Sequence, residues 1–298
     1  MTRICRVTLG GDLNSTSGPS VALAIMTESL REDSCFQDLD MANNKSLNTD
    51  DLVWISIYWD RPKILSLIAE GRRFAIGPNV LFDYSQSPGL NDTERKIMEY
   101  DNYAAIFWQS RWYAELGRKN FRQKISHYVL SCPLPQSWIN RPYSKIQDID
   151  ALIFSKGGDN ELKIANQLAL LFPNHKIISG NYKREELFEY ASRSKVCFHI
   201  SREDSYSIAS AEINLAGCPI LSDEKSSPVV RHGVTGFLVP VRERSEKEPF
   251  TWDLDSAYRL ADLFDAATDL DRNIIRSATI QACSNESFRK TVKSILKL

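Results

Sequence analysis

In the stretch from Ser201 to Val239, two acidic side chains are spaced so that both could lie beside one binding pocket. Asp204 stands just before a predicted helix, and Glu212 lies eight positions later, within an apolar stripe of that helix. A carboxylate in such a stripe is costly unless it is paired or faces a cleft. A helix start suits a phosphate, and a carboxylate within the helix suits hydroxyl groups such as those of a ribose. The plainer alternative is a surface cap at Asp204 and a paired core acid at Glu212.

The elements around these acids are marked by cap and stop residues. Ser205 or Ser207 can cap the helix, because a side-chain oxygen there accepts from a backbone N–H that has no helical partner. Gly217 ends the helix and Pro219 prevents its continuation. A strand and a glycine-punctuated turn are expected to follow.

Composition narrows the class of protein. The 298 residues carry a net charge of −1 and are 43% hydrophobic, which suggests two domains of ordinary size and argues against a dedicated nucleic-acid binder. The six cysteines are scattered with no C-x-x-C pair, a pattern typical of free thiols in a reducing compartment. No apolar run approaches the length that spans a bilayer. We therefore expect a soluble cytoplasmic protein.

Apolar strand-like runs alternate with helical patterns along the chain, which predicts parallel sheets covered by helices on both faces. The expected strands are 3–9, 52–57, 74–76, 104–108 and 127–130 in the first half, and 151–155, 176–178 and 196–200 in the second. Ligands bind such sheets at the carboxyl ends of the strands. Lys156 leaves a strand end and precedes two glycines, so it is placed to meet a phosphate as a point charge. His199, inside a strand, is interpreted as a satisfied core histidine.

The stretch 201–239 resembles the C-terminal signature of the GT-B glycosyltransferases of family 4. That signature is an acid, a small/aromatic/small loop, a Glu after seven intervening positions, then Ala-x-Gly-x-Pro and a Gly-x-x-Gly turn. It stands here as Asp204, Ser205-Tyr206-Ser207, Glu212, Ala216-Gly217-Cys218-Pro219 and Gly233-Val234-Thr235-Gly236. The family usually has Glu as the first acid and glycines in the loop, and Glu203 is an adjacent candidate for the acid.

The resemblance covers residues 151–239 well and implies an α/β chain of GT-B architecture, with two Rossmann-like doubly wound parallel-sheet domains facing across a cleft. It implies an acceptor-side domain over 1–140, a shortened nucleotide-sugar-binding domain over 141–284, and a final helix over 285–298 that returns to the first domain. A proline-rich linker, 132–142, joins the domains.

The resemblance also implies roles for single residues. Asp204, or Glu203 if the register slips by one, would orient the donor sugar, and Glu212 would bind ribose hydroxyls. Lys156 and the N–H groups around Ser205–Ile208 would hold the diphosphate; the family's second cation is replaced by Glu161. Further donor contacts are implied at matching positions, namely Ser17, Gly18, Asn79, Gly180, Tyr182, Tyr206, Ser207 and Ile208.

The predicted function is transfer of a sugar, with retention, from a nucleotide-diphosphate sugar to an acceptor that is a glycan, lipid carrier, protein or nucleic-acid base. No cofactor and no metal are implied; the D-x-D triplets at 148–150, 253–255 and 269–271 are interpreted as turn and helix-cap acids. A basic, aromatic segment, 111–124, could contact a membrane surface, although a solvated helix explains it as well. The alternatives are a sugar-nucleotide epimerase of GT-B fold and a degenerate, non-catalytic GT-B binding subunit.

Overall fold

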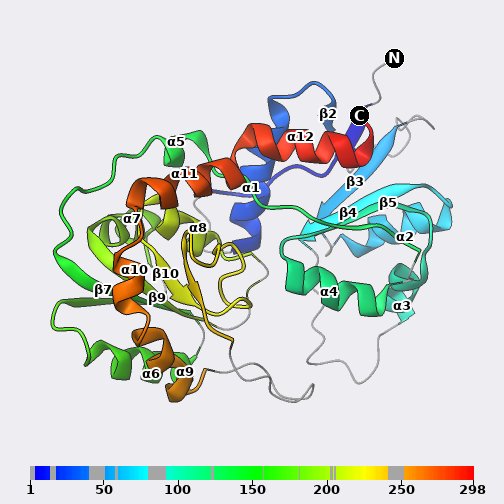
Figure 1. Ribbon diagram of the computed structural model, residues 1–298. Helices are drawn as coiled ribbons and strands as arrows, with labels where there is room; N and C mark the ends of the chain where they lie inside the picture. Colours follow the sequence, from blue (N-terminus) through cyan, green and yellow to red (C-terminus); the bar gives the residue numbers. More distant parts are fainter. Residues whose placement is uncertain are drawn as a thin grey trace. The chain divides into compact units, whose positions relative to one another are not determined.

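The chain divides into two compact units in the computed structural model (Figure 1). The first comprises Met1–Pro135 with Ser284–Leu298, and the second comprises Gln136–Cys283. The structure describes residues 4–13, 18–39, 51–57, 60–79, 92–121, 124–156, 158–180, 182–201, 204, 206–240 and 252–298, and for Ile57 and Asn79 only the backbone.

The first unit contains a sheet with the strand order β2-β1-β3-β4-β5-β6, in which every described pairing is parallel. Its strands are β1 (Cys5–Val7), β2 (Phe36–Asp38), β3 (Leu52–Ile57), β4 (Phe74–Asn79), β5 (Tyr103–Trp108) and β6 (His127–Val129). The central strands are continuous apolar runs, and Trp54, Ile55 and Ile106 are fully buried. Such runs are typical of parallel strands that are covered on both faces.

Helices cover both faces of the first sheet. They are α1 (Gly18–Arg31), α2 (Arg61–Ala69), α3 (Asp92–Glu99), α4 (Arg111–Asn120) and, from the end of the chain, α12 (Asn285–Leu296). The chain leaves β1 toward one edge of the sheet and leaves β3 toward the other, so right-handed crossovers place α1 and α2 on opposite faces. α12 packs on α1 and β5, and Arg289 and Lys293 of α12 pair with Glu32 and Asp33.

The second unit contains a parallel sheet with the order β11-β10-β9-β7-β8. Its strands are β7 (Ile149–Lys156), β8 (His175–Ser179), β9 (Ser194–Ser201), β10 (Ile220–Ser222) and β11 (Gly236–Leu238). Its helices are α5 (Gln136–Ile139), α6 (Asp159–Ala169), α7 (Arg184–Arg193), α8 (Ile208–Leu215), α9 (Leu254–Ala261), α10 (Phe264–Thr268) and α11 (Arg272–Cys283).

Alternate residues of β7 and β9 face opposite sides of the second sheet. Ile153 and Phe198 belong to an apolar core shared with α6, α9 and α10. Phe154 and His199 point to the other side, where their rings stack at 5.1 Å and where α8 packs on α7 and on α11. The prediction of parallel sheets with helices on both faces is confirmed.

Several elements differ from the sequence predictions. The short strand β2 and the helices α3 and α5 were not expected. Of the D-x-D acids, Asp253 and Asp271 do cap helices, accepting from Ser256 N–H and from two N–H groups at the start of α11. Asp150 is not a turn residue; it lies inside β7, where it pairs with Lys195.

Candidate functional site

The carboxyl ends of β7 and β9 form the switch point of the second sheet. From β7 the chain moves to β8 on one side, and from β9 it moves to β10 on the other, so α6 and α8 leave this edge on opposite faces. Lys156 and Ser201, the last residues of β7 and β9, are partners in register. Open α/β sheets bind their ligands at such a switch point.

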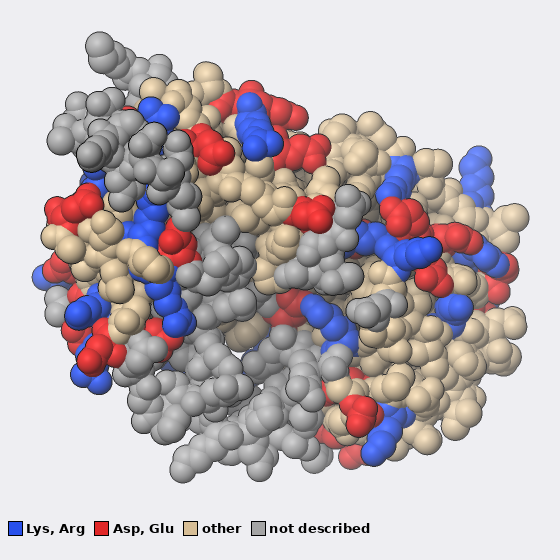
Figure 2. All heavy atoms as spheres, turned by 180° about the vertical axis from the view of Figure 1, so that it is seen from behind, with Lys and Arg blue, Asp and Glu red and all other residues tan. Residues whose placement is uncertain are grey.

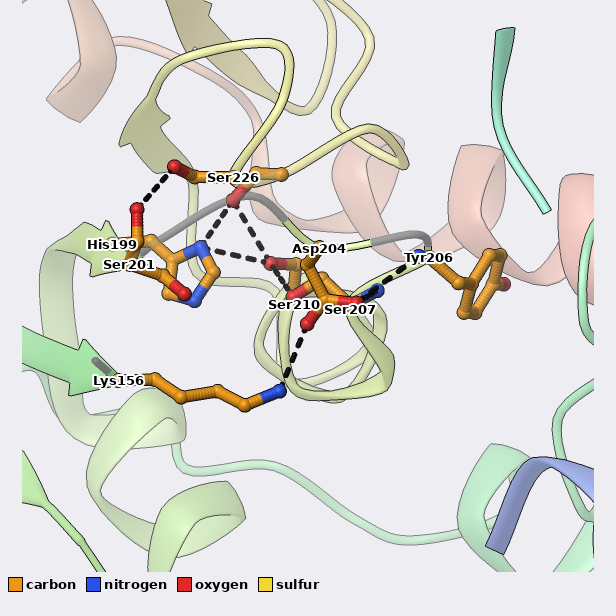
Figure 3. Close-up of polar contacts among 9 residues, drawn as sticks. Lys156, His199, Ser201, Asp204, Tyr206, Ser207, Ser210 and Ser226 are labelled. Carbon is orange, nitrogen blue, oxygen red and sulfur yellow. Dashed lines mark hydrogen bonds and ion pairs between the residues drawn. The ribbon is translucent and has the colours of Figure 1, made fainter. Parts of the chain in front are cut away.

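Asp204 is held by three donors at this edge (Figure 3). The Lys156 ammonium donates to Oδ2 at 2.9 Å, and the N–H groups of Tyr206 and Ser207 donate to Oδ1 at 3.1 and 3.0 Å. Burial raises the pKa of Asp204, but the Lys156 charge and the backbone donors outweigh it and hold that pKa below its usual value. Asp204 is therefore an ionised carboxylate that orders the loop into α8, and Lys156 remains 58% exposed beside it.

Ser207 occupies the N-cap position of α8 in the left-handed region (φ 62°, ψ 75°), and its side chain makes no cap hydrogen bond. Of the two expected caps, Ser205 or Ser207, Ser207 is therefore excluded, and Ser205 lies outside the described residues. The first intrahelical bond runs from the N–H of Ala211 to the carbonyl of Ser207. The three N–H groups that precede Ala211 are those a helix leaves to capping groups or to a ligand.

Glu212 is 1% exposed and makes an ion pair with only one of its oxygens. Arg184, at the start of α7, donates to Oε2 at 2.6 Å and lies over the ring of Trp138 at 5.3 Å. Oε1 is buried without a hydrogen-bond partner among the described residues. Burial raises the pKa of Glu212 to about 7, although the Arg184 and Arg141 charges act in the opposite direction. A buried acceptor without a donor is suited to a ligand hydroxyl.

His199 is fully buried on β9 and contacts Ser210 in the first turn of α8. Its Nδ1 makes hydrogen bonds with the hydroxyl oxygens of Ser227 and Ser210. Its Nε2 is buried without a partner among the described residues, so the prediction of a satisfied core histidine holds for one ring nitrogen only. Burial, with Lys156 in addition and against the Asp204 charge, lowers the pKa of His199 to about 3, and the ring is neutral at pH 7.

The other predicted donor residues are spread more widely. The ring of Tyr206 points away from Lys156 and Asp204, and its hydroxyl meets Cys283 Sγ at 3.2 Å (Figure 3). Ile208 is the first residue of α8. Tyr182 packs edge-on against Phe154 at 5.1 Å, and burial, with the Glu212 charge, raises the pKa of its hydroxyl.

The remaining predicted positions lie at strand and helix ends or outside the described residues. Gly180 follows β8 with φ 65°, and open space surrounds the position that a Cβ would take. Gly18 is the first residue of α1 in the first unit, and Asn79 is the last residue of β4. Ser17, Glu203 and Ser205, and the side chain of Asn79, fall outside the described residues.

Glu161, which stands where the resemblance implies a second cation, is a helix cap. It is fully buried, and its Oε2 accepts from the N–H of Gly158 at 2.8 Å, closing the first turn of α6. A carboxylate in the first turn of a helix is stabilised by the helix dipole. This position therefore contributes to the stability of α6 rather than to the charge of the site.

Sequence reasoning missed Arg184 and Asp223. Arg184 lies in a run of charged residues that reads as a solvated helix face, so no local pattern marked it. Asp223 follows β10 directly, and this position at a strand end was a usable signal. Its Oδ1 accepts from the N–H groups of Lys225 and Ser226 at 2.8 and 3.2 Å, and Oδ2 is buried without a partner in the described part of the chain. Burial, which these donors oppose, raises the pKa of Asp223 to about 6.

The far end of α8 is fixed by two arginines of α11. Gly217 follows the helix with φ 78°, which confirms the predicted stop. Arg272 donates to the carbonyls of Ser144, Ser192, Ala216 and Gly217, and Arg276 donates to those of Ile139, Arg141 and Leu215. Cations at a helix C-terminus satisfy its last carbonyls and complement its dipole.

On the surface, acidic and basic side chains are interspersed over the described part of the face in Figure 2. In the basic segment 111–124, Tyr113 and Phe121 are buried in the core of the first unit, and Trp112 packs against that core. Arg111, Arg118 and Lys119 are exposed. Among the described residues no cluster of His, Cys, Asp and Glu could hold a metal ion, and no helix is long and apolar enough to cross a membrane.

Solved structures share this fold at low sequence identity. Anabaena HepE, crystallised with UDP and glucose, is 11% identical with a TM-score of 0.63, and the match covers 100% of both chains. Sucrose-phosphate synthase from Thermosynechococcus elongatus is 12% identical with a TM-score of 0.66, over 100% of this chain and 98% of that one. A variant of TarM from S. aureus, solved with UDP, fondaparinux and alpha-GlcNAc-glycerol, is 12% identical with a TM-score of 0.59. That match covers 86% of this chain and 58% of TarM.

No protein-family model matches the sequence, and no curated protein matches it. At this level of identity the solved structures bear on the fold and not on the reaction. The chain has two parallel-sheet α/β units and matches HepE and sucrose-phosphate synthase over its whole length. Its fold is that of the GT-B glycosyltransferases.

Proposed function

We propose that this protein is a glycosyltransferase, related to family 4, that moves a sugar from a nucleoside-diphosphate sugar to an acceptor hydroxyl with retention of the anomeric configuration. The observation that carries the proposal is the arrangement at one sheet edge. The Lys156 ammonium, the start of α8 and the unpartnered Oε1 of Glu212 belong to the elements that meet at the switch point of the second unit. Two proteins that share the fold, HepE and TarM, were crystallised with UDP.

Each group has a role that its chemistry suits. The Lys156 ammonium and the first N–H groups of α8 would neutralise the diphosphate, which gains negative charge as it leaves. Oε1 of Glu212 would accept from a ribose hydroxyl, a bond that also supplies its missing donor. Asp204 holds the loop in place, and reaching the sugar would require it to share an oxygen that already accepts from Lys156 or from the backbone.

The proposed reaction needs no protein nucleophile. The bond between the anomeric carbon and the diphosphate oxygen breaks, and the acceptor oxygen bonds to the same face of the carbon. The acceptor proton passes to the departing phosphate oxygen. The protein's contribution is to orient the donor and to stabilise the leaving charge, and this chemistry calls for neither a cofactor nor a metal.

The test begins with binding, because neither the base nor the sugar of the donor is identified. Purified protein is screened by thermal shift against UDP-, ADP- and GDP-sugars, since a bound donor stabilises the folded state by mass action. Hits are measured by calorimetry and then assayed for sugar transfer to candidate acceptors and for hydrolysis. Binding of no nucleotide sugar and no free nucleoside diphosphate would refute the proposal.

Two other outcomes would replace it. An epimer formed without acceptor would make the protein a sugar-nucleotide epimerase. Tight donor binding with neither transfer nor hydrolysis, over a broad acceptor set, would make it a binding subunit. The Asp204→Asn variant tests whether transfer needs the charge of Asp204 or only the ordered loop. The amide oxygen can still accept from the N–H groups of Tyr206 and Ser207, while the charge is lost.

A further inference from the structure

A buried cluster of three hydroxyls and one imidazole lies at the start of α8; Figure 3 labels three of its members, His199, Ser207 and Ser210. Nδ1 of His199 bonds to Ser227 Oγ and lies 3.3 Å from Ser210 Oγ. Ser210 Oγ lies 3.0 Å from Ser227 Oγ and 2.8 Å from Ser207 Oγ. The four residues come from β9, from α8 and its N-cap, and from the loop after β10, and none is more than 3% exposed.

The contacts form a chain that runs from His199 through Ser227 and Ser210 to Ser207. Each hydroxyl carries one hydrogen, so if the contacts His199–Ser227, Ser227–Ser210 and Ser210–Ser207 are all hydrogen bonds, the chain runs in one of two directions. If Nδ1 accepts, every hydrogen points toward the histidine and Ser207 presents only lone pairs to its surroundings. If Nδ1 carries the hydrogen, the order reverses and the Ser207 hydroxyl hydrogen is free to donate at the start of α8.

The unpartnered Nε2 of His199 decides between the two directions. It is buried against Phe154, with no hydrogen-bond partner among the described residues. A hydrogen on Nε2 would be a buried donor without an acceptor, which native proteins tolerate less often than an acceptor without a donor. The neutral ring therefore carries its hydrogen on Nδ1, which donates to Ser227.

We propose that His199 is a positioning residue that acts through Ser227 and Ser210 to turn the Ser207 hydroxyl into a hydrogen-bond donor for the diphosphate of the nucleotide. This inference rests on the proposed function, because it assumes that a diphosphate occupies the start of α8. Ser207 carries its side chain at φ 62°, in a region where a glycine would be unstrained. The hydroxyl gives the site a neutral donor where the described cation, Lys156, is already paired with Asp204.

The test compares ligands that differ by one phosphate. Affinities for UDP and UMP, and for the ADP/AMP and GDP/GMP pairs, are measured by calorimetry on the wild-type protein and on Ser207→Ala, Ser227→Ala and Ser226→Ala. Ser226 is a matched control, because it is an equally buried serine of the same loop whose hydroxyl donates to the Ser201 carbonyl and lies outside the chain.

We expect Ser207→Ala and Ser227→Ala to weaken binding of the diphosphate by roughly tenfold and of the monophosphate by less than about twofold. Ser226→Ala should leave the ratio of the two affinities unchanged. Equal losses for both ligands, or an unchanged affinity for the diphosphate in Ser207→Ala, would overturn the inference. If the wild-type protein binds no nucleotide, the proposed function fails and this inference fails with it.

A spectroscopic measurement tests the tautomer directly. Nitrogen-15 NMR of histidine-labelled protein at neutral pH should show the His199 hydrogen on Nδ1, with the signal assigned by its absence in His199→Phe. The hydrogen on Nε2 would contradict the proposal even if the binding data agreed with it. Should His199→Phe fail to fold, which its melting curve would show, Ser227→Ala assigns the signal by its shift.

Discussion

Arg184 donates to Oε2 of Glu212 across 2.6 Å, while Oε1 of the same carboxylate is buried with no partner among the described residues. Among the described residues, only one of the two carboxylate oxygens of Glu212 thus has a hydrogen-bond donor. Arg184 stays partly exposed at the start of α7, so the charge on Glu212 is balanced from one side and left open on the other. A ligand that supplies a hydroxyl donor completes the hydrogen bonding of the pair.

At pH 8, above the raised pKa of Glu212, replacing Glu212 by Gln should weaken nucleoside-diphosphate binding by roughly tenfold or more, because a charged acceptor for the ribose hydroxyls is lost. Calorimetry with the nucleoside diphosphate that the screen selects and with its 2′-deoxy counterpart measures this effect. The wild-type protein should prefer the ribose form, and the variant should show little preference. Glu189→Gln is the control, since Glu189 pairs with Arg193 and is 65% exposed. An undiminished preference for ribose in Glu212→Gln would remove Glu212 from the ligand site.

Glu212 should make the stability of the protein depend on pH. Its pKa is raised from 4.5 to about 7, so between these values the folded protein keeps a proton that the unfolded chain has released. Stability should therefore fall as the pH rises through this window, by on the order of 3 kcal/mol from this group, and stay level above it. Asp223, raised from 3.8 to about 6, acts in the same direction at lower pH.

Denaturant unfolding of the wild-type protein, Glu212→Gln and Asp223→Asn between pH 4 and pH 8 measures both contributions. Glu212→Gln should flatten the curve between pH 5 and pH 7, and Asp223→Asn should flatten it below pH 6. Identical slopes in all three proteins would mean that neither carboxyl keeps its proton in the folded state.

Replacing Lys156 by Ala should weaken binding of the nucleoside diphosphate that the screen selects by on the order of tenfold and of its monophosphate by about twofold, because the ammonium is expected to meet the second phosphate. The fold should be affected little: Lys156 is more than half exposed, and such an ion pair contributes about 0–1 kcal/mol. Lys163→Ala, on the exposed face of α6, is the matched control. A diphosphate affinity that tolerates the loss of Lys156 would contradict this role.

Two glycines allow the stability cost of backbone strain to be measured separately from the cost of a steric contact made by an added Cβ. Gly217 and Gly233 both have positive φ, 78° and 73°, so alanine at either should cost about 1–2 kcal/mol in backbone strain. Only at Gly217 would the added Cβ meet a neighbour, at 3.2 Å from Cβ of Arg272. Unfolding measurements should show Gly217→Ala to be less stable than Gly233→Ala by about 1 kcal/mol. Equal losses would show that the start of α11, whose Arg272 Cβ and backbone oxygen lie against Gly217, shifts at no measurable cost.

The sequence predicted the elements that have strong local signals. The strand over 52–57 was predicted to the residue from its apolar run, which follows the acidic pair Asp50-Asp51, and the end of α8 was predicted from Gly217. β2 was not predicted because a strand of three residues at the edge of a sheet is too short to show an alternating hydrophobic pattern. α3 escaped because its charged surface leaves only Ile97 and Met98 buried.

The candidate site was predicted in part for the same physical reasons. Lys156 and Asp204 were found from positions at strand and helix ends, and the structure brings them within 2.9 Å. The partner of Glu212 could not be found, because Arg184 is 28 positions away in a run of charges. The hydroxyl cluster around His199 is built by tertiary packing, and each serine reads as an ordinary loop or helix residue when taken alone.

The arginine pair at the end of α8 has a consequence for the order in which the chain folds. Arg272 bonds to the carbonyls of Ser144, Ser192 and Ala216, all of which leave the ribosome before it does. Arg276 follows it four residues later. During synthesis these carbonyls have no guanidinium donor until α11, the last helix of the unit, has been made. The five strands of the sheet are complete before that point. The second unit can therefore gain its sheet early, but it acquires a fixed α8, and with it a fixed switch-point edge, only when α11 has been made.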